Sequence, residues 1–272
     1  MQANGKDITV HANGINICYD DLGTGGVPLL LIHGFPFDKS MWKPQVDFHK
    51  NHRRVIAADI RGFGKSTANS EKGSISLFAD DLIQFMDVLQ LKKVMACGLS
   101  MGGYIVLDAV NRYPERFDSI VLCDTQCIAD SPEGKAKRYE TIKMIEAGGL
   151  ADFAGGFINK CFSEETLKTK KELVENTKKV ILAGSIASIT STLAALAERQ
   201  ERCSSLDQLD IPALVLCGAE DTITPLAQSE FLHHHIKDSS FYSISGAGHL
   251  SNLEQPEQFN QHLNDFNRSR NL

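Results

Sequence analysis

The chain has 272 residues, of which 42% are hydrophobic and 23% are charged. This balance is typical of globular proteins and suggests neither a disordered nor a fibrous chain. With 28 basic and 34 acidic residues, the formal charge is −6, which favours neither nucleic acid nor an anionic membrane as a partner. The first residues lack the apolar run of a signal peptide, and no stretch approaches the ~18 consecutive apolar residues of a membrane-spanning helix. We therefore expect a cytoplasmic protein, and the sequence leaves open whether it forms a homo-oligomer.

Strand-like runs alternate with helical patterns over the first 125 residues. Two alternating runs, at 7–12 and 15–20, flank Asn13-Gly14, which is a strong hairpin signal. Four continuously apolar runs follow, as expected of strands buried on both faces: PLLLIH (28–33), RVIAADI (54–60), KKVMACG (92–98) and SIVLCD (119–124). Apolar residues at helical spacing predict helices over 74–89 and 101–113. The alternation predicts an α/β fold with a mostly parallel sheet and an antiparallel hairpin at its edge.

No strand run is present from about residue 130 to residue 206. Four helical segments are predicted there instead: 133–147, 150–161, 164–183 and 186–197. Strand signals resume at 211–218 and 240–245, with a helix over 226–235 between them and a last helix that Pro256 opens. Since the strands on both sides need each other to complete one sheet, we predict a core domain of residues 1–125 and 207–272. Residues 126–206 would form a helical cap, or lid, on this core.

The cysteines and a histidine run give no sign of a metal site. Seven cysteines are an odd number, and Cys97, Cys123 and Cys217 lie in or at the end of apolar runs, where they would pack as small hydrophobes. Their wide spacings fit neither a zinc site nor a disulfide framework, so we expect reduced thiols. The run at 233–235 would point three imidazoles to different faces of a helix, which is typical of surface sequence.

A nucleophile is indicated by Gly98-Leu99-Ser100-Met101-Gly102, which matches G-x-S-x-G. The motif follows a predicted strand and precedes a predicted helix, as a nucleophile elbow requires. Glycines on either side of the serine would remove side chains that collide with the neighbouring strand and helix. The alternative is that Ser100 is only the N-cap of a helix, and the motif alone does not separate the two interpretations.

A serine hydroxyl needs a base to become nucleophilic, and the base needs an acid to orient it. His249 lies on a glycine-flanked loop after the last strand-like run, at the sheet edge where Ser100 must emerge. His33 also ends a strand-like run, but it is better placed to hold a loop. For the acid we favour Asp221, which directly follows a strand and gives the chain order serine, acid, histidine. Asp124, also at a strand end, and Glu220 remain competitors.

Charge that develops on a substrate carbonyl oxygen needs donors that already point at it. The backbone N–H of Met101, at the start of a helix, is one candidate. The second is the N–H of Phe35, in the His33-Gly34-Phe35 loop that follows a strand. These two amides would form an oxyanion hole.

Five motifs in this order show a resemblance to the α/β-hydrolase superfamily. They are HGFPFD (33–38), DIRGFGKS (59–66), GLSMGG (98–103), GAEDTITP (218–225) and GAGHLSNLEQPE (246–257). The resemblance implies an eight-stranded, largely parallel sheet, a helical cap after the sixth strand and no cofactor. HGFPFDKSMW and GAGHLSNLEQPE look most similar to small carboxylesterases and 3-oxoadipate enol-lactonase-like proteins. The resemblance to the superfamily also implies that Asp59, Arg61 and Gly62 shape a loop near the site, and that Pro36 fixes the backbone beside Phe35.

The predicted activity is hydrolysis of a small carboxylic ester or lactone through an acyl-enzyme on Ser100. Phe153, Phe157 and Phe162 of the cap are expected to line or cover an apolar pocket, or simply to pack. A C–C bond hydrolase of ring-cleavage products would use the same triad, and Arg138 or Lys160 would then pair with a second substrate carboxylate, as they would in a lactonase. A cofactor-free perhydrolase or haloperoxidase-like activity and a non-catalytic ligand sensor are further alternatives.

Overall fold

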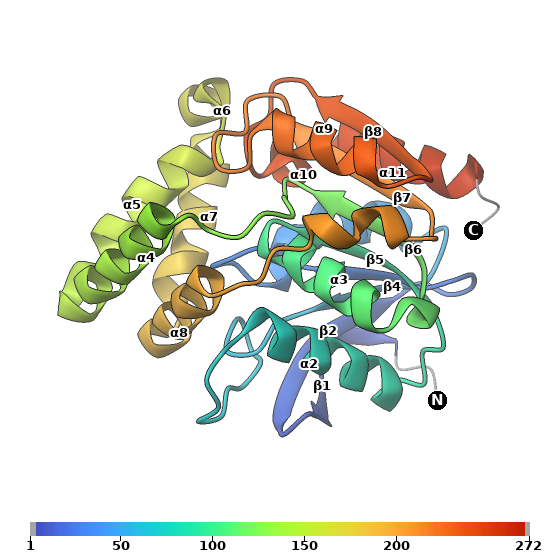
Figure 1. Ribbon diagram of the computed structural model, residues 1–272, viewed down its shortest axis with the longest axis horizontal. Coiled ribbons are helices and arrows are strands. Elements are labelled where there is room, and N and C mark those ends of the chain that lie inside the picture. The colour runs from blue at the N-terminus through green and yellow to red at the C-terminus, as the bar shows by residue number, and fades with distance from the viewer. Residues whose placement is uncertain (1–3, 270–272) are drawn as a thin grey trace.

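The computed structural model of the protein describes residues 4–269 (Figure 1). Its strands form one eight-stranded sheet in the order β1-β2-β4-β3-β5-β6-β7-β8. The strands are β1 (Gly5–Ala12), β2 (Ile15–Leu22), β3 (Leu29–Ile32), β4 (Val55–Ala58), β5 (Val94–Leu99), β6 (Phe117–Cys123), β7 (Ala213–Gly218) and β8 (Ser239–Ile244). β2 pairs antiparallel with β1 and β4, and every other pair is parallel. The predicted sheet, with its hairpin at one edge, is confirmed.

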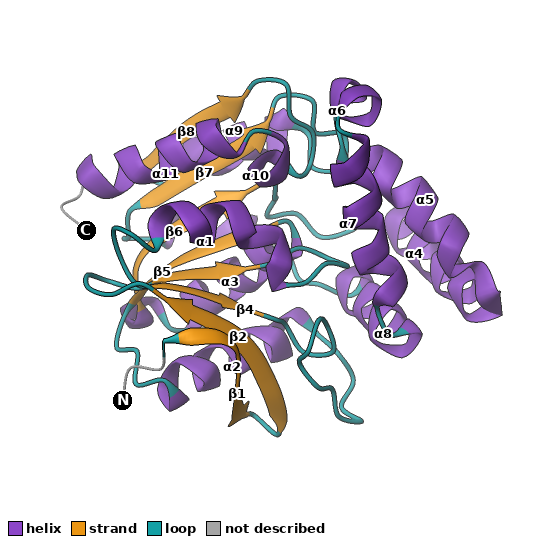
Figure 2. Ribbon diagram, turned by 180° about the vertical axis from the view of Figure 1, so that it is seen from behind, coloured by secondary structure: helices purple, strands orange, loops and turns teal. Residues whose placement is uncertain are grey.

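Helices cover both faces of the sheet (Figures 1 and 2). The covering helices are α1 (Lys43–His49), α2 (Ile75–Val88), α3 (Met101–Arg112), α9 (Leu226–His235) and α11 (Pro256–Ser269). Successive side chains of a strand point to opposite faces, and β3 shows the result. Leu30 and Ile32 belong to the apolar cluster under α2, α3 and α9. Leu29 and Leu31 belong to the cluster under α1 and α11. The continuously apolar strands are therefore buried on both sides, as predicted.

Five α-helices lie between β6 and β7, and they project beside the carboxyl ends of the parallel strands (Figure 2). They are α4 (Pro132–Met144), α5 (Leu150–Cys161), α6 (Glu164–Thr169), α7 (Lys171–Ala183) and α8 (Ile186–Ala197). The serines before α4, α6 and α8 each accept a hydrogen bond from a backbone amide of the first turn, so the sequence itself starts these helices. We refer to residues 126–206 as the cap, and its division from the core remains a prediction.

The prediction of a single helix over 164–183 is wrong. Lys170 leaves helical geometry, at φ −106° and ψ 48°, and separates α6 from α7. Its ammonium donates to the backbone carbonyl of Glu254 in the core. This tertiary contact has no counterpart in local helical periodicity.

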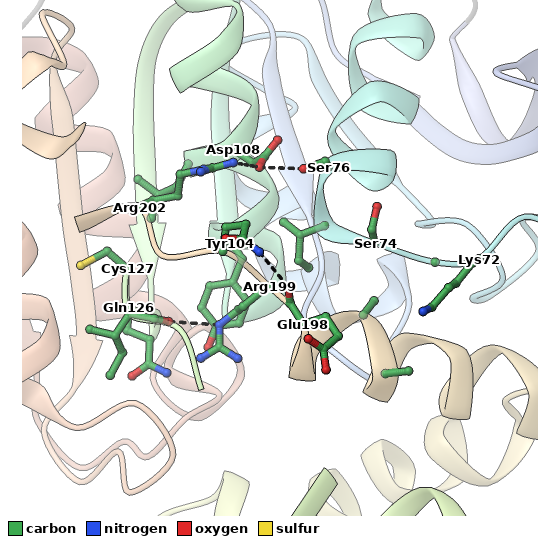
Figure 3. A pocket seen from close by; sticks show the side chains of 17 residues that line it. Lys72, Ser74, Ser76, Tyr104, Asp108, Gln126, Cys127, Glu198, Arg199 and Arg202 are labelled. Carbon is green, nitrogen blue, oxygen red and sulfur yellow. Dashed lines mark hydrogen bonds and ion pairs between the residues drawn. The ribbon is translucent and has the colours of Figure 1, made fainter. Parts of the chain in front are cut away.

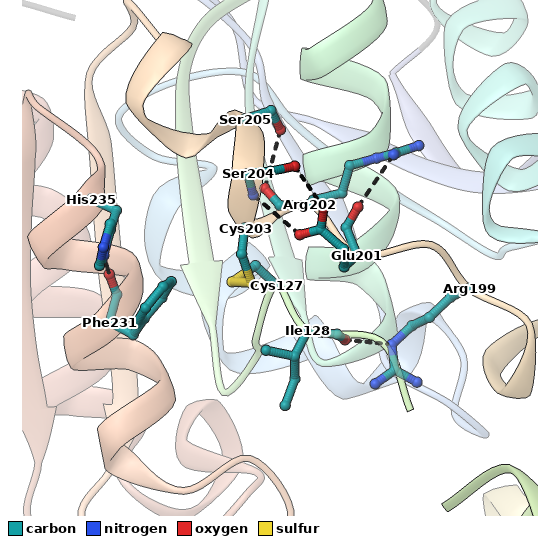
Figure 4. Close-up of a disulfide and its surroundings, with 10 residues drawn as sticks. All are labelled: Cys127, Ile128, Arg199, Glu201, Arg202, Cys203, Ser204, Ser205, Phe231 and His235. Carbon is teal, nitrogen blue, oxygen red and sulfur yellow. Dashed lines mark hydrogen bonds between the residues drawn. A yellow bond between two sulfur atoms is a disulfide. The ribbon is translucent and has the colours of Figure 1, made fainter. Parts of the chain in front are cut away.

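The expectation that all cysteines are reduced is also wrong, because Cys127 and Cys203 form a disulfide (Figure 4). The two residues are 76 positions apart, but they lie on the segments that enter and leave the cap, next to the paired strands β6 and β7. Their proximity depends on the sheet order and not on their spacing. The other cysteines, all buried, are free thiols: Cys18, Cys97, Cys123, Cys161 and Cys217.

Disulfides persist mainly in oxidising compartments, and the cytoplasmic location therefore remains a prediction. Over residues 4–269, no single helix is long and apolar enough to cross a membrane; α7 and α8, bent by 96° relative to each other, meet that test only as a pair.

Candidate active site

Ser100 occupies a sharp turn between β5 and α3, with φ 55° and ψ −114°. A Cβ on Gly98 would lie 2.3 Å from the carbonyl carbon of Gly102, and one on Gly102 would lie 2.2 Å from the carbonyl oxygen of Ile32. Only glycine fits either position. The Ser100 side chain makes no capping hydrogen bond to α3, which excludes the simple N-cap alternative. The turn has the geometry of a nucleophile elbow.

A continuous chain of hydrogen bonds joins Ser100, His249 and Asp221. His249 Nε2 lies 2.8 Å from Ser100 Oγ, and His249 Nδ1 lies 2.8 Å from Asp221 Oδ2. His249 and Asp221 are buried, whereas Ser100 is partly exposed. The structure thus brings the three predicted residues together at the carboxyl ends of the strands. Their catalytic roles remain a prediction.

The carboxylate of Asp221 is held by four donors. Besides His249 Nδ1–H, it accepts hydrogen bonds from the Ile223 and Thr224 amides and from Thr224 Oγ1, at 2.7–3.0 Å. Sequence reasoning missed Thr224, although an aspartate that accepts hydrogen bonds from backbone amides a few residues later is a common local pattern. Thr224 Oγ1 also lies 3.3 Å from His249 Nδ1. It therefore fixes the acid and the imidazole together.

The charges of this pair follow from their surroundings. Burial opposes ionisation of Asp221, but attraction to His249 and the hydrogen bonds from His249 and Thr224 hold the pKa of Asp221 below its ordinary value. Burial likewise opposes protonation of His249. The Asp221 charge and hydrogen bond outweigh this burial, so the pKa of His249 lies above the ordinary histidine value. An imidazole in this setting is well suited to take a proton from Ser100.

The competing residues have other partners. Asp124 accepts a hydrogen bond from the Gly218 amide at 2.8 Å and another from the Ser251 hydroxyl. Burial and the neighbouring Asp221 raise the pKa of Asp124 well above its usual range. Glu220 is exposed. None of the described hydrogen bonds joins either acid to His249.

His33 is buried and holds the loop that follows β3. Its Nδ1 lies 2.9 Å from the Gly34 carbonyl oxygen, and its Nε2 accepts a hydrogen bond from the Ile60 amide at 2.9 Å. The ring is therefore the Nδ1–H tautomer. Burial lowers the pKa of His33, which keeps the ring neutral in this role.

The loop after β3 lies directly against the nucleophile. A Cβ on Gly34 would be 3.3 Å from Ser100 Cβ. Phe35, the next residue, therefore lies close to Ser100. The peptide bond between Phe35 and Pro36 is cis. The Met101 amide is the first of α3 and has no acceptor within the helix. Both positions suit donors to an oxyanion, and that role remains a prediction.

The segment 59–66 supports this loop. The Asp59 carboxylate accepts hydrogen bonds from the amides of Lys39 and Lys65 at 2.8 and 3.0 Å. Arg61 forms a buried ion pair with Asp81. A Cβ on Gly62 would lie 2.6 Å from the hydroxyl oxygen of Ser188 in the cap. These contacts agree with the expected loop-shaping roles.

A cavity of about 530 Å³ lies between core and cap, and chain neighbours of the triad residues line part of it. Its core wall includes Phe35 and Ile223, and the Phe35 ring contacts the rings of Phe153 and Phe157 at 6.2 and 6.1 Å between centroids. Phe162 does not line this cavity; it is buried in the apolar cluster on the α11 face. Of the three cap aromatics, two line the pocket and one packs.

A second cavity of about 320 Å³ lies between α2, α3 and the segment after α8 (Figure 3). The guanidinium of Arg199 lies over the ring of Tyr104, 4.7 Å from its centroid, and Arg202 pairs with Asp108. No triad residue lines either cavity, but the first is lined by Phe35, which follows Gly34 against Ser100, and by Ile223, whose amide donates to Asp221. We therefore assign the candidate active site to the first cavity.

One group among residues 4–269, formed by Asp124, Cys217 and Asp221, places three potential metal-ligand atoms within 4.8 Å of one another. Both carboxylates already accept hydrogen bonds from protein donors. Burial also raises the pKa of the Cys217 thiol far above its usual range, whereas a metal ligand must be a thiolate. The group does not fit a cation, and we expect no metal.

Residues 27–256 match the model of the α/β-hydrolase fold family. Among curated proteins, 3-oxoadipate enol-lactonase 2 of Acinetobacter baylyi is 30% identical over 254 residues, 93% of each chain. Enol-lactonase 1 of the same organism is 32% identical over 232 residues, 85% of each chain. Among solved structures, a thermophilic esterase from Thermogutta terrifontis is 33% identical, with a TM-score of 0.92 over 96% of this chain and 98% of that one. The resemblance to esterases and enol-lactonases is confirmed, and the chain belongs to the α/β-hydrolase fold family.

Proposed function

We propose that this protein hydrolyses a small carboxylic ester or lactone through an acyl-enzyme on Ser100. The observation that carries the proposal is the hydrogen-bonded chain from Ser100 Oγ through His249 to Asp221, with 2.8 Å at each step. The names of the enol-lactonase relatives and of the similar esterase support the same reaction class.

The reaction begins when Ser100 Oγ attacks the substrate carbonyl and His249 Nε2 takes the hydroxyl proton. Asp221 holds Nδ1–H and stabilises the imidazolium that forms. The Phe35 and Met101 amides donate to the oxyanion. When the tetrahedral intermediate collapses, the C–O bond to the leaving group breaks and His249 returns the proton to that oxygen. In a lactone this oxygen stays tethered to the acyl group.

Water completes the cycle. His249 Nε2 takes a proton from the water that attacks the acyl carbonyl, the bond to Ser100 Oγ breaks, and the proton passes to Ser100. The product is a free acid, which for a lactone also carries the released hydroxyl group. The apolar wall formed by Phe35, Phe153 and Phe157 suits the hydrocarbon part of a small substrate.

The cap supplies positive charge to this cavity. Lys137, Arg138 and Lys160 line it, together with the acids Asp130 and Asp152. Arg138 is paired with Asp130. Lys137 and Lys160 are exposed, and within residues 4–269 neither forms an ion pair. We propose that Lys137 and Lys160 attract a substrate that has a free carboxylate in addition to the ester or lactone group that is hydrolysed.

The test compares release of p-nitrophenol from acetate, butyrate and octanoate esters, and opening of neutral and carboxylated lactones, by the wild type and by Ser100→Ala. We expect Ser100→Ala to lose nearly all turnover while keeping the wild-type circular dichroism spectrum. Full activity in that variant would refute the assignment. Turnover of ring-cleavage diketones, but of no ester or lactone, would point to the C–C hydrolase alternative.

The charge proposal is tested with Lys160→Ala. We expect a higher KM for the carboxylated lactone and an unchanged KM for the neutral one, because only the former uses the ammonium. Lys168→Ala is the matched control, since its ammonium pairs with Glu164 and does not line the cavity. This role would be excluded if, for each of the two lactones, Lys160→Ala had the same KM as the wild type.

A further inference from the structure

Glu254 is a fully buried acid at the end of α10 (Ser251–Glu254), five residues after His249. Its Oε1 accepts a hydrogen bond from the Gly248 amide at 2.7 Å. Its Oε2 accepts two from Ser163, one from the amide at 2.9 Å and one from Oγ at 2.8 Å. Burying a carboxylate is unfavourable unless donors replace the lost water. Here three neutral donors do so, and no ion pair within residues 4–269 involves this carboxylate.

These donors come from two different parts of the molecule. Gly248 immediately precedes His249, whereas Ser163 lies in the cap, in the turn between α5 and α6. One carboxylate therefore links the loop that carries His249 to the cap. The mechanism described above gives it no role.

The cap turn lies directly on the histidine loop. A Cβ on Gly248 would lie 3.0 Å from the Ser163 amide nitrogen and from the carbonyl carbon of Phe162, so glycine permits this close approach. On the other side of His249, the Leu250 amide donates to the Cys161 carbonyl at 3.2 Å. Both residues that flank His249 are thus fixed to the same turn of the cap, one through Glu254 and one directly.

We propose that Glu254 is a positioning residue, which together with Ser163 of the cap fixes the loop of His249 so that Nε2 stays within hydrogen-bonding distance of Ser100. The inference rests on the proposed function, because it gives Glu254 a role only if His249 is the base. Glu254 touches neither the substrate nor the reacting atoms. The cap would then contribute to orientation of the base as well as to the walls of the cavity.

Charge gives this role a distinctive signature. Three acids bear on buried His249: Asp221, Asp124 and Glu254. Burial lowers the pKa of His249, and the three acids raise it. Replacing Glu254 with glutamine removes one negative charge, so the pH midpoint for formation of neutral His249 should move to lower pH. Ser163→Ala removes the hydrogen bond to Glu254 and the one that caps α6, but no charge, and should leave that midpoint in place.

The experiment measures the rate at which a fluorophosphonate labels Ser100, as a function of pH, because this reaction needs Ser100 and its base but no natural substrate. We expect Glu254→Gln to label about 10- to 100-fold more slowly at its pH optimum, the loss that a small misplacement of a catalytic group produces, with its midpoint shifted to lower pH. Ser163→Ala should label roughly tenfold more slowly, with the midpoint unchanged. With an ester substrate, both variants should lower kcat more than they raise KM.

Matched controls separate positioning from general damage. Glu257→Gln removes an exposed acid from the next helix, and Ser185→Ala removes the serine that caps α8 but lies away from His249. Both should label at the wild-type rate. If Glu254→Gln does not fold, Ser163→Ala against Ser185→Ala decides the question. Wild-type rates in folded Glu254→Gln or in Ser163→Ala would overturn the positioning role, whereas a wild type that never labels would overturn the proposed function itself.

Discussion

The disulfide between Cys127 and Cys203 should make a large contribution to stability. It closes a loop across 76 positions, and the chain-entropy relation for a loop of that length gives about 4.5 kcal/mol. Native disulfides commonly contribute somewhat less, about 2–4 kcal/mol. The two segments that the disulfide joins are also held by a hydrogen bond from the Arg202 amide to the Cys127 carbonyl at 2.8 Å and by the ion pair between Arg199 and Asp130. The chain should therefore still fold without the covalent bond.

The perturbation is the double variant Cys127→Ala/Cys203→Ala, compared with the wild type in urea with and without dithiothreitol. We expect the free energy of unfolding to fall by about 3 kcal/mol in the double variant and by a similar amount in the reduced wild type. Reductant should not change the double variant, because its remaining cysteines are already free thiols. Ser100 labelling should persist in both, since none of the described hydrogen bonds of the triad involves either cysteine. A wild-type unfolding curve that is identical with and without reductant would refute the reasoning.

Three further variants test the candidate site. Gly102→Ala should abolish folding or Ser100 labelling, because its Cβ would lie 2.2 Å from the Ile32 carbonyl oxygen. Gly155→Ala is the control and should behave as the wild type, since its Cβ meets only a lysine ammonium at 4.0 Å. Labelling of Ser100 in a folded Gly102→Ala variant would disprove the packing of the elbow. Thr224→Val should reduce kcat about tenfold, through loss of one hydrogen bond to the Asp221 carboxylate, and an unchanged kcat would remove Thr224 from the site. Asp221→Asn should reduce kcat by about 10³- to 10⁴-fold. The wild-type kcat/KM should be lost as the pH falls through the pKa of His249, which lies above the ordinary value because of Asp221. In Asp221→Asn the midpoint of this loss should move to lower pH. An unmoved midpoint in a pH series would contradict the pairing of His249 with Asp221.

Sequence patterns predicted the sheet and the meeting of the triad residues because both depend on simple rules. Continuously apolar runs indicate strands buried on two faces, and the carboxyl ends of parallel strands share one edge of the sheet. Ser100, Asp221 and His249 each follow a strand, so their proximity follows from the topology.

The contacts that sequence reasoning missed depend on packing between distant segments. The disulfide requires β6 and β7 to be neighbours, the break at Lys170 accompanies its contact with Glu254, and the link from Glu254 to Ser163 crosses from core to cap. Local spacing carries none of this information. Thr224 differs, since its position three residues after Asp221 was available as a local signal.

The most direct test of the central claim is the mass of peptides from enzyme quenched during turnover of a p-nitrophenyl ester. If Ser100 is the nucleophile and His249 its base, the peptide that contains Ser100 should carry the mass of the acyl group, and Ser100→Ala should show neither the adduct nor turnover. Turnover by Ser100→Ala, or an adduct on another residue with Ser100 unmodified, would contradict the account.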